Sequence, residues 1–367
     1  MKVAIIGTRG IPASYSGFET SVQETSTRFV KKNIETFVYC RANHYKEKFK
    51  EYRGVKLIYL PSVKSKHLDT ITNTLLTCFH LLFRKYDVVI VYGVGNSLFI
   101  PLIKLFGKPV ISVVDGADWE RKKWGKFAKI FLKFSRFFAV YFSNYYVVDN
   151  ELLAEEYFTR FGVRPVSIPY GANLDFENKI EILKRYGLEK NKFIIFVGRF
   201  VKEKGIEFLI ENYAKVKTDI KLVIVGDNIT DKTYVAKIKH TKDPRIIFTG
   251  FLYGQDYETL LHNALLYVSC SFLEGTSPSL LSAMAIIGFA LVSDLKENQE
   301  VLKGCCITFK TGDGEDFVNK LDYYLNNSSL IELEREKTKE IIKKFYNWDN
   351  ITEKYIYLFN QILKVRE

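Results

Sequence analysis

The chain has 367 residues, of which 47% are hydrophobic and 26% are charged, and its formal net charge is +12. This length exceeds a typical single domain and suffices for two α/β domains, each with its own core. The composition is globular, and no uncharged apolar stretch of about 18 residues predicts a membrane-spanning helix. The basic excess favours a polyanionic partner, which can be a phosphate-bearing substrate, an anionic membrane surface or a nucleic acid.

The amino terminus, MKVAIIGTRGIP, predicts a short buried strand that runs into a glycine turn, and it lacks the features of a signal peptide. We therefore expect a cytoplasmic protein. The five cysteines include no CxxC pair, and their odd number argues against a disulfide framework. We expect them to be reduced thiols in the cores.

Apolar runs rich in Val, Ile and Phe recur along the chain, separated by amphipathic stretches. Short continuous runs of this kind are typical of parallel strands that are buried on both faces. In the first half they lie at residues 2–7, 35–40, 55–60, 87–93, 109–115, 145–149 and 165–169. In the second half they lie at residues 192–198, 220–227, 245–250, 266–270, 290–294 and 306–309. The alternation predicts two doubly wound, Rossmann-like α/β domains.

The strand pattern begins again near residue 190, after a polar and charged segment that marks the domain boundary. We predict an N-terminal domain over residues 1–173, a second domain over 174–345 and a terminal helix over 346–367. Apolar residues of this last segment recur on one helical face, which needs a surface to cover. They are Ile351, Tyr355, Leu358, Phe359 and Ile362.

The first motif, GTRGIPASYSGFET, follows the first strand and leads into a helix that we expect to begin near Glu19. The glycines of this turn, Gly7, Gly10 and Gly17, would let backbone N–H groups approach a phosphate or a sugar. Their spacing differs from the dinucleotide-binding GxGxxG, which argues against a nicotinamide-dependent oxidoreductase. A tight turn without a ligand is the structural alternative.

The second motif, FVGRFVKEKG, places Gly198 and Arg199 directly after a strand, with Lys204 in the turn that follows. The carboxyl ends of parallel strands form the ligand crevice of this fold class, and a guanidinium and an ammonium there can neutralise a diphosphate. The alternative is a solvated charged loop, because the chain contains 54 Lys and Arg residues and most such residues are exposed.

The third motif is SFLEGTSPSLLSAMA. Glu274 ends a strand-like segment, and the small residues Gly275, Thr276 and Ser277 form a turn before a helix that opens near Pro278. Proline is favoured at the first helical position, and the free N–H groups of a helix start attract anions. We expect a phosphate here.

The glycine loop, GRFVKEKG and EGTSPSLLSAMA together resemble the retaining, metal-independent glycosyltransferases of family 4, over essentially the whole chain. The resemblance implies an α/β fold of the GT-B type: two Rossmann-like doubly wound domains facing a cleft, with a C-terminal crossing helix that packs back on the first domain. It implies that Arg199 and Lys204 hold the donor diphosphate and that Glu274 contacts the donor sugar. The donor-binding positions of the second domain are Gly198, Gly275, Thr276, Ser277 and Ser282.

A narrower resemblance rests on IGTRGIPASYSGFET and VVDGADWERKKWG, which are similar to a subgroup of bacterial polysaccharide enzymes that includes rhamnosyltransferases. Many members of the wider family have a histidine after the strand that corresponds to VISVV, whereas this chain has Asp115. Asp115 and Asp118 could orient sugar hydroxyls or the acceptor, on the side of Gly10, Gly17 and Glu19, and we group Asp115 with the catalytic residues. Helix capping is the alternative for both aspartates.

Ser282 departs from the family pattern, which has a second glutamate at this position, usually on the ribose hydroxyls. A serine is too short to offer the same bidentate acceptor. Either the nucleotide is held differently, or the donor lacks a ribose hydroxyl as a thymidine nucleotide does, or the activity is lost. Both a UDP-sugar and a dTDP-sugar remain open as the donor.

Residues 124–141 place aromatic side chains at helical spacing, with basic residues between them. A helix of this kind can lie on anionic lipid, or it can bury its aromatic face against the sheet. Peripheral contact at the inner face of the cell membrane is therefore an alternative to a purely cytoplasmic location. Nucleic-acid binding is not favoured, because no recognised module is present. The aromatic residues are Trp124, Phe127, Phe131, Phe134 and Phe138.

The sequence as a whole predicts a retaining glycosyltransferase that moves a hexosyl or rhamnosyl residue from a nucleoside-diphosphate sugar to a lipid-linked or growing glycan. The main catalytic contribution would be electrostatic stabilisation of the departing diphosphate. We expect no cofactor and no essential metal, because the histidines are scattered and no suitable carboxylate pair is present. The alternative, suggested by Ser282, is a non-catalytic GT-B protein that binds nucleotide or glycan and regulates a partner.

Overall fold

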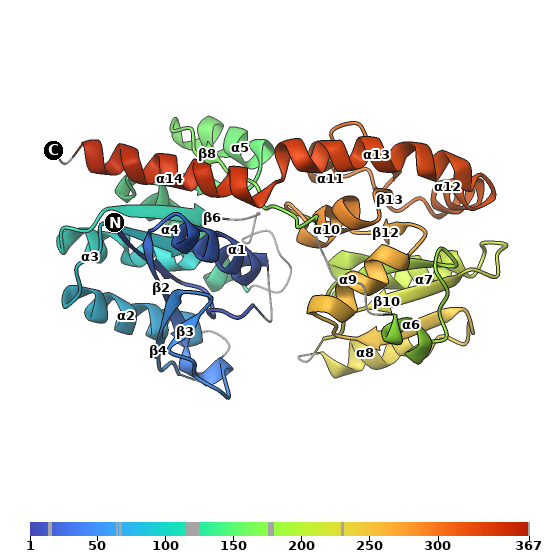
Figure 1. Cartoon of the computed structure of the whole chain (residues 1–367), viewed down its shortest axis with the longest axis horizontal. Coiled ribbons are helices and arrows are strands. Elements are labelled where there is room, and N and C mark those ends of the chain that lie inside the picture. The colour runs from blue at the N-terminus through green and yellow to red at the C-terminus, as the bar shows by residue number, and fades with distance from the viewer. Residues whose placement is uncertain are drawn as a thin grey trace. The chain divides into compact units, whose positions relative to one another are not determined.

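The computed structural model describes residues 1–13, 17–63, 65, 68–114, 125–174, 180–228 and 231–365. These residues form two compact units, which Figure 1 shows with their helices and strands labelled. Unit 1 contains Met1–Tyr170 and Trp348–Glu367, and unit 2 contains Gly171–Asn347. Each unit is an α/β domain built around a sheet of parallel strands, which confirms the predicted fold class.

The sheet of unit 1 has the strand order β3-β4-β2-β1-β5-β6-β7-β8. Its strands are β1 (Lys2–Ile6), β2 (Glu35–Arg41), β3 (Glu51–Tyr52), β4 (Val55–Leu60), β5 (Val88–Tyr92), β6 (Val110–Val114), β7 (Tyr145–Val148) and β8 (Val166–Ser167). Every residue of β5 and β6 is buried, as continuous Val and Ile runs predict for central strands. No apolar run predicts β3, a short edge strand that pairs antiparallel with β4.

Helices form most of the connections between the parallel strands of unit 1, whereas β2 and β4 are joined through a short 3₁₀ turn and β3. The helices of unit 1 are α1 (Gly17–Lys31), α2 (Leu68–Leu82), α3 (Ile100–Leu105), α4 (Lys126–Phe142), α5 (Glu151–Phe161) and α14 (Trp348–Lys364), with short 3₁₀ turns η1 (Ala42–His44) and η2 (Val94–Phe99). In the part of the chain that the structure describes, no helix combines the length and the hydropathy needed to span a bilayer.

The last helix, α14, packs along α1, so the two ends of the chain meet in unit 1 (Figure 1). The ring of Phe29 on α1 is fully buried, and its centroid lies 6.3 Å from that of Tyr355 and 5.1 Å from that of Phe359. An ion pair of 2.8 Å between Arg28 and Asp349 borders this contact. The apolar face of α14 therefore packs against α1 within unit 1.

The sheet of unit 2 has the strand order β11-β10-β9-β12-β13-β14, and its paired strands run parallel. The strands are β9 (Phe193–Val197), β10 (Lys221–Val225), β11 (Ile246–Gly250), β12 (Tyr267–Ser269), β13 (Ala290–Ser293) and β14 (Ile307–Phe309). The direction of strand addition reverses at β9. Strands β10 and β11 follow on one side of β9, and β12, β13 and β14 follow on the other. Ligands of open α/β sheets bind at such a switch point, beyond the carboxyl ends of the strands.

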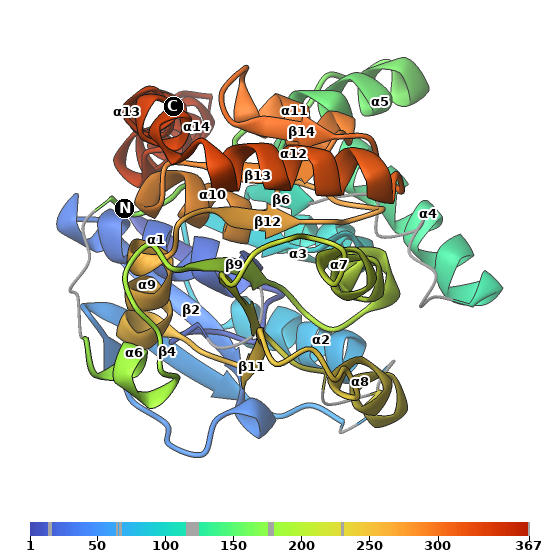
Figure 2. The same ribbon diagram turned by 90° about the vertical axis from the view of Figure 1, so that its right-hand side faces the viewer.

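The helices of unit 2 are α6 (Glu181–Arg185), α7 (Ile206–Tyr213), α8 (Lys232–Lys239), α9 (Gly254–Asn263), α10 (Pro278–Ile286), α11 (Lys296–Leu302), α12 (Gly314–Asn326) and α13 (Ser328–Phe345). Buried residues of α7, α8 and α12 share one hydrophobic core with side chains of β9 and β10. Figure 2 shows α7 and α8 on one side of these strands and α6 and α9 on the other. Unit 2 is thus a sheet covered by helices on both faces.

Candidate functional site

The turn after β9 is shaped by close contact between two stretches of backbone. Gly205 has φ +64°, and a Cβ atom at this position would lie only 1.9 Å from the carbonyl oxygen of Cys270. Only glycine permits both this conformation and this approach. The contact fixes the 3₁₀ turn Lys202–Lys204 against the segment that follows β12, and the backbone N–H of Phe272 donates to the carbonyl of Glu203 over 2.8 Å.

Lys204 and Glu274 form an ion pair at this junction, as the ammonium of Lys204 donates to Oε1 of the Glu274 carboxylate. The side chains are 18% and 9% exposed, so water screens their charges only partly. Oε1 of Glu274 also accepts a hydrogen bond of 2.8 Å from the hydroxyl of Ser271. The structure therefore brings together two residues that the sequence placed in separate motifs.

Neighbouring buried polar groups hold the Glu274 carboxylate in place. Ser271 is fully buried, and its backbone carbonyl accepts a hydrogen bond of 2.7 Å from the hydroxyl of Ser293 at the end of β13. Asn298, on α11, donates to the backbone carbonyl of Ser293 over 2.9 Å. The links among Asn298, Ser293 and Ser271 are buried and the link from Ser271 to Glu274 is part-buried, so a continuous set of hydrogen bonds joins α11 to Glu274.

Helix α10 begins directly after Glu274, with Pro278 at its first position and Ser277 as its N-cap residue. Thr276 and Ser277 are buried, and Gly275 is half-buried. The hydroxyl of Ser279 contacts that of Ser277 over 3.1 Å and that of Tyr267 over 3.2 Å. The N–H groups of the first turn and the helix dipole give this end of α10 the positive potential of an anion site.

Gly198 and Arg199 continue β9 beyond its last residue, at the carboxyl edge of the sheet. The backbone carbonyl of Gly198 lies in tight contact with Gly226, where a Cβ atom would approach it to 1.9 Å. Arg199 is half-buried, and its guanidinium has no hydrogen-bond or ion-pair partner among the residues that the structure describes. Its positive charge is therefore not neutralised by a neighbouring carboxylate in that part of the chain.

Ser282 lies in the second turn of α10 and is half-buried. Its hydroxyl hydrogen-bonds the phenol of Tyr257 on α9, and burial raises the pKa of that phenol far above its usual value. No sequence pattern predicts this partner, because the two residues belong to different helices. At the position where the resemblance implies a glutamate, this chain has a hydroxyl pair that joins α9 to α10.

In unit 1 the glycine loop is held by the helix that it precedes. The buried carboxylate of Glu19 accepts a hydrogen bond of 3.1 Å from the backbone N–H of Arg9, and Gln23 accepts one of 2.9 Å from that of Ala13. A Cβ atom on Gly10 would lie 2.4 Å from the Cys40 sulfur.

Packing thus explains the glycine at position 10, and loop capping explains the acidic residue at position 19. Gly17 is the first residue of α1, two residues before the start that the sequence predicted at Glu19. Asp115 and Asp118 lie outside the described residues.

A polar cluster in unit 1 was missed by the sequence interpretation. The Asp69 carboxylate accepts hydrogen bonds from Arg41 over 2.7 Å, from the hydroxyl of Ser62, and from Nε2 of His44 over 3.2 Å when that nitrogen is protonated. Burial alone would raise the pKa of Asp69, but the hydrogen bonds from Ser62 and Arg41 outweigh it and hold the pKa below its usual value. The signal available was the position of Arg41 directly after the strand predicted at residues 35–40.

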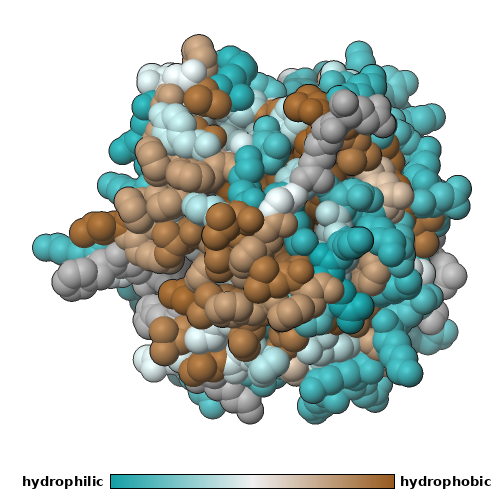
Figure 3. All heavy atoms as spheres, turned by 90° about the vertical axis from the view of Figure 1, so that its left-hand side faces the viewer, coloured by the Kyte–Doolittle hydropathy of each residue, from teal (hydrophilic) through white to brown (hydrophobic). Residues whose placement is uncertain are grey.

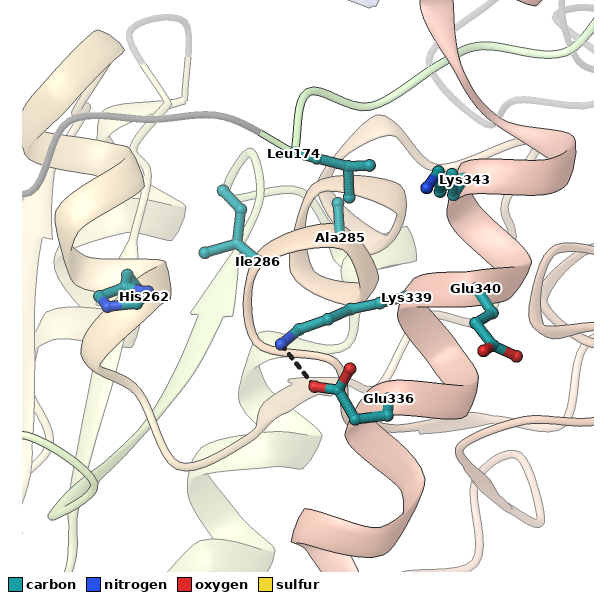
Figure 4. Close-up of a pocket in the computed structure, with 8 residues that line it drawn as sticks. All are labelled: Leu174, His262, Ala285, Ile286, Glu336, Lys339, Glu340 and Lys343. Atoms are coloured by element: carbon teal, nitrogen blue, oxygen red, sulfur yellow. Dashed lines mark hydrogen bonds and ion pairs between the residues drawn. The ribbon is translucent and has the colours of Figure 1, made fainter.

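Within the described ranges, the structure contains no group of three His, Cys, Asp or Glu side chains that could hold a metal ion. It does contain a pocket of 410 Å³ in unit 2, between α9, α10 and α13 (Figure 4). Arg199, Lys204 and Glu274 do not line it, and its charged residues include a 3.0 Å ion pair between Lys339 and Glu336. The pocket is separate from the site built on these three residues. It is lined by Leu174, His262, Ala285, Ile286, Glu336, Lys339, Glu340 and Lys343.

Comparison with known proteins divides the chain at nearly the same place as the structure does. Residues 178–348 match the family described as glycosyl transferases group 1, and residues 1–173 match a domain of unknown function, DUF1972. An uncharacterised glycosyltransferase of Methanocaldococcus jannaschii is 28% identical over 202 residues, which are 52% of this chain and 50% of that protein.

An enzyme of Campylobacter jejuni is 31% identical over 116 residues, which are 31% of each chain. Its name is N-acetylgalactosamine-N,N'-diacetylbacillosaminyl-diphospho-undecaprenol 4-alpha-N-acetylgalactosaminyltransferase. The chain therefore spans half or less of the length of these curated relatives.

Solved structures match over the whole chain at low identity. Sucrose-phosphate synthase from Thermosynechococcus elongatus has a TM-score of 0.84 at 16% identity, over 99% of both chains. HepE of Anabaena, in complex with UDP-glucose, has a TM-score of 0.80 at 12% identity, over 98% of this chain and 99% of that one. At this identity the likeness establishes the fold. The chain thus has the GT-B fold of two Rossmann-like units, and residues 178–348 match the family of glycosyl transferases group 1.

Proposed function

We propose that the protein is a glycosyltransferase that takes a sugar from a nucleoside-diphosphate sugar held by unit 2. The observation that carries the proposal is the Lys204–Glu274 pair beside the first turn of α10, with Arg199 at the end of the neighbouring strand β9. Cations and helix N–H groups suit a diphosphate, and a carboxylate suits sugar hydroxyls. The match of residues 178–348 to glycosyl transferases group 1 supports this assignment.

In the proposed reaction, an acceptor hydroxyl attacks the anomeric carbon of the donor sugar from the face that the diphosphate leaves. The bond from the anomeric carbon to the phosphate oxygen breaks, and the diphosphate departs with the bonding electrons. The hydroxyl proton passes to the departing diphosphate, so the anomeric configuration is retained. Arg199, Lys204 and the N–H groups of α10 stabilise the charge that grows on the phosphate oxygens, without a metal ion.

For the substrates, we propose a UDP- or dTDP-linked hexose or rhamnose as the donor and a lipid-linked or growing glycan as the acceptor. The Campylobacter jejuni relative is named for transfer to a glycan on diphospho-undecaprenol, and the Anabaena structure contains UDP-glucose. The net charge of +12 suits both an anionic donor and an anionic lipid carrier. Unit 1 would hold the acceptor, as its residues 1–170 lie outside the group 1 match.

The function is tested first by its reaction. A panel of UDP- and dTDP-sugars is screened for thermal stabilisation of the protein, and the donor selected is incubated with lipid-linked glycans. We expect release of nucleoside diphosphate, a product with the donor's anomeric configuration by NMR, and a rate that a metal chelator leaves unchanged. Stabilisation by a nucleotide sugar without any transfer or hydrolysis would support the non-catalytic alternative instead.

Arg199→Ala and Lys204→Ala should each weaken nucleoside-diphosphate binding by about 10- to 100-fold, because each removes a charge-assisted contact worth roughly 1.5–3 kcal/mol. Turnover at low donor concentration should fall by a similar factor, because less donor is bound. Lys202→Ala is the matched control, since Lys202 is an exposed lysine of the same turn. Calorimetric titration with the nucleoside diphosphate measures the effect. Wild-type affinity in both site variants would remove this turn from the donor site.

Glu274→Gln should reduce transfer by about 10- to 100-fold, because it removes a charged acceptor for the sugar hydroxyls. Binding of the nucleoside diphosphate should fall much less, since the proposed contact is to the sugar. Glu207→Gln on α7 serves as the control, because Glu207 pairs with the exposed Lys237. Steady-state kinetics and titration with the diphosphate separate the two effects. Equal losses in both measurements would instead indicate that Glu274 acts only by positioning Lys204.

Ser282→Glu should shift the preference between UDP and dTDP towards UDP by tenfold at most. A carboxylate can accept from both ribose hydroxyls of uridine, and a charged hydrogen bond contributes about 1–2 kcal/mol before repulsion from the diphosphate is subtracted. The variant also breaks the hydrogen bond to Tyr257, so Tyr257→Phe is the control for that loss. Competition between the two diphosphates gives the ratio. An unchanged ratio in a folded Ser282→Glu variant would show that residue 282 does not face the ribose.

A further inference from the structure

Helix α2 of unit 1 exposes several large apolar side chains, although it buries polar ones. Its buried residues are Asn73, Thr74, Thr77, Cys78 and Leu81, whereas Leu75 and Phe79 are 38% and 51% exposed. A surface helix of a globular protein ordinarily has the opposite arrangement, with its polar residues facing water. Three polar residues of α2 therefore face the interior, beside Cys78 and Leu81, whereas Leu75, Leu76 and Phe79 are exposed.

The orientation of α2 is fixed by hydrogen bonds from its buried polar residues. The hydroxyl of Thr74 donates to Asn96 over 2.6 Å, and Asn96 donates to the backbone carbonyls of Gly7 and Tyr92 over 3.0 and 2.7 Å. Asn73 donates to the carbonyl of Leu60 over 3.2 Å. Turning α2 to bury Leu75 and Phe79 would leave these polar groups without their hydrogen-bond partners, which disfavours that orientation.

Helix α4 also directs a hydrophobic stripe outward. Ile130, Phe134, Phe137 and Tyr141 recur at helical spacing and are 45–64% exposed. On the opposite side, Arg136 is 1% exposed and is held by an ion pair of 3.4 Å with Glu156. Its guanidinium also lies 5.5 Å from the centre of the Tyr157 ring. The buried arginine fixes the rotation of α4 just as the polar residues fix that of α2.

These two faces form one surface, because α3 contacts both α2 and α4. Leu105 on α3 is 80% exposed, and Phe83, directly after α2, is 85% exposed. Figure 3 views the molecule from the side on which α2 and α3 lie in Figure 1 and shows hydrophobic residues gathered over a broad area. We call the outward apolar residues of α2, α3 and α4, with Phe83, the apolar face. Large contiguous patches of this kind mark interaction sites.

Exposed basic residues accompany the apolar face: Arg84, Lys85, Lys104, Lys126 and Lys133. Helices α3 and α4 contain no carboxylate. The acidic residue of α2, Asp69, is already paired with Arg41 over 2.7 Å. Apolar and aromatic side chains beside exposed cations are the features with which proteins bind anionic lipid surfaces.

We propose that the apolar face of unit 1 docks on an anionic lipid bilayer. The Leu and Phe side chains enter the interfacial region, and the flanking Lys and Arg residues contact lipid phosphates. Association with a second copy through the same face would bring these like charges together, which disfavours it. The proposal goes beyond sugar transfer and is tested without donor or acceptor, so it can fail while the proposed function holds.

The test is flotation of the full chain with vesicles of phosphatidylcholine, either alone or with about 30% phosphatidylglycerol. We expect binding to the anionic vesicles that weakens with salt. Phe83→Ser and Phe134→Ser should each reduce the partition coefficient about tenfold, since each removes an exposed aromatic side chain. Leu333→Ser on α13 is the control, because Leu333 is 75% exposed but lies in unit 2. Its partition should equal that of the wild type.

The charge contribution is tested with Lys126→Gln combined with Lys133→Gln, which should lower the partition about 25-fold, or fivefold for each charge removed. The control pair is Lys217→Gln and Lys242→Gln, which removes two exposed lysines of unit 2. Circular dichroism and the melting temperature verify that all variants are folded. Equal losses in the site and control pairs would overturn the proposal. So would a dimer in solution that Phe83→Ser converts to a monomer, without vesicle binding by the wild type.

Discussion

The candidate site depends on the contact between Gly205 and the carbonyl oxygen of Cys270. This approach, which leaves no room for a Cβ atom, presses the turn after β9 against the segment after β12. Lys204 and Glu274, far apart in sequence, form an ion pair because of it. The start of α10 follows at once, so a cation, a carboxylate and a helix N-terminus are positioned by one packing interaction at the switch point of the sheet.

Much of the fold could be predicted from the sequence, since parallel strands buried on both faces have a simple signature. The runs at 87–93 and 109–115 became β5 and β6, in which every residue is buried. The edge strand Glu51–Tyr52 has only two residues and no apolar run, so nothing distinguished it from a loop. Helix α4 illustrates a different limit, because periodicity predicts the helix but cannot tell which face is buried. The buried Arg136 decides that question through its contact with Glu156.

The motifs of the site could be predicted one by one, but the contacts between them could not. Sequence identified Lys204 and Glu274 separately, but their pairing depends on strand order, which brings β9 beside β12. The Ser282–Tyr257 hydrogen bond and the Asp69 cluster each join residues of different elements, so no local pattern reveals them. Glu19 is the opposite case. It belongs to a recognisable motif, but in the structure its carboxylate accepts a hydrogen bond from the backbone N–H of Arg9 and so stabilises the loop.

The two ends of the chain meet in unit 1, and this has a consequence for how the protein emerges from the ribosome. Residues of unit 2 are contiguous, so that unit can fold as soon as its own segment has been synthesised. Synthesis of unit 1 begins first, but its folding is completed last, because Phe29 on α1 is covered by Tyr355 and Phe359 of α14. Throughout synthesis of unit 2, the nascent chain carries an uncovered aromatic surface on α1, which is where a chaperone would bind it.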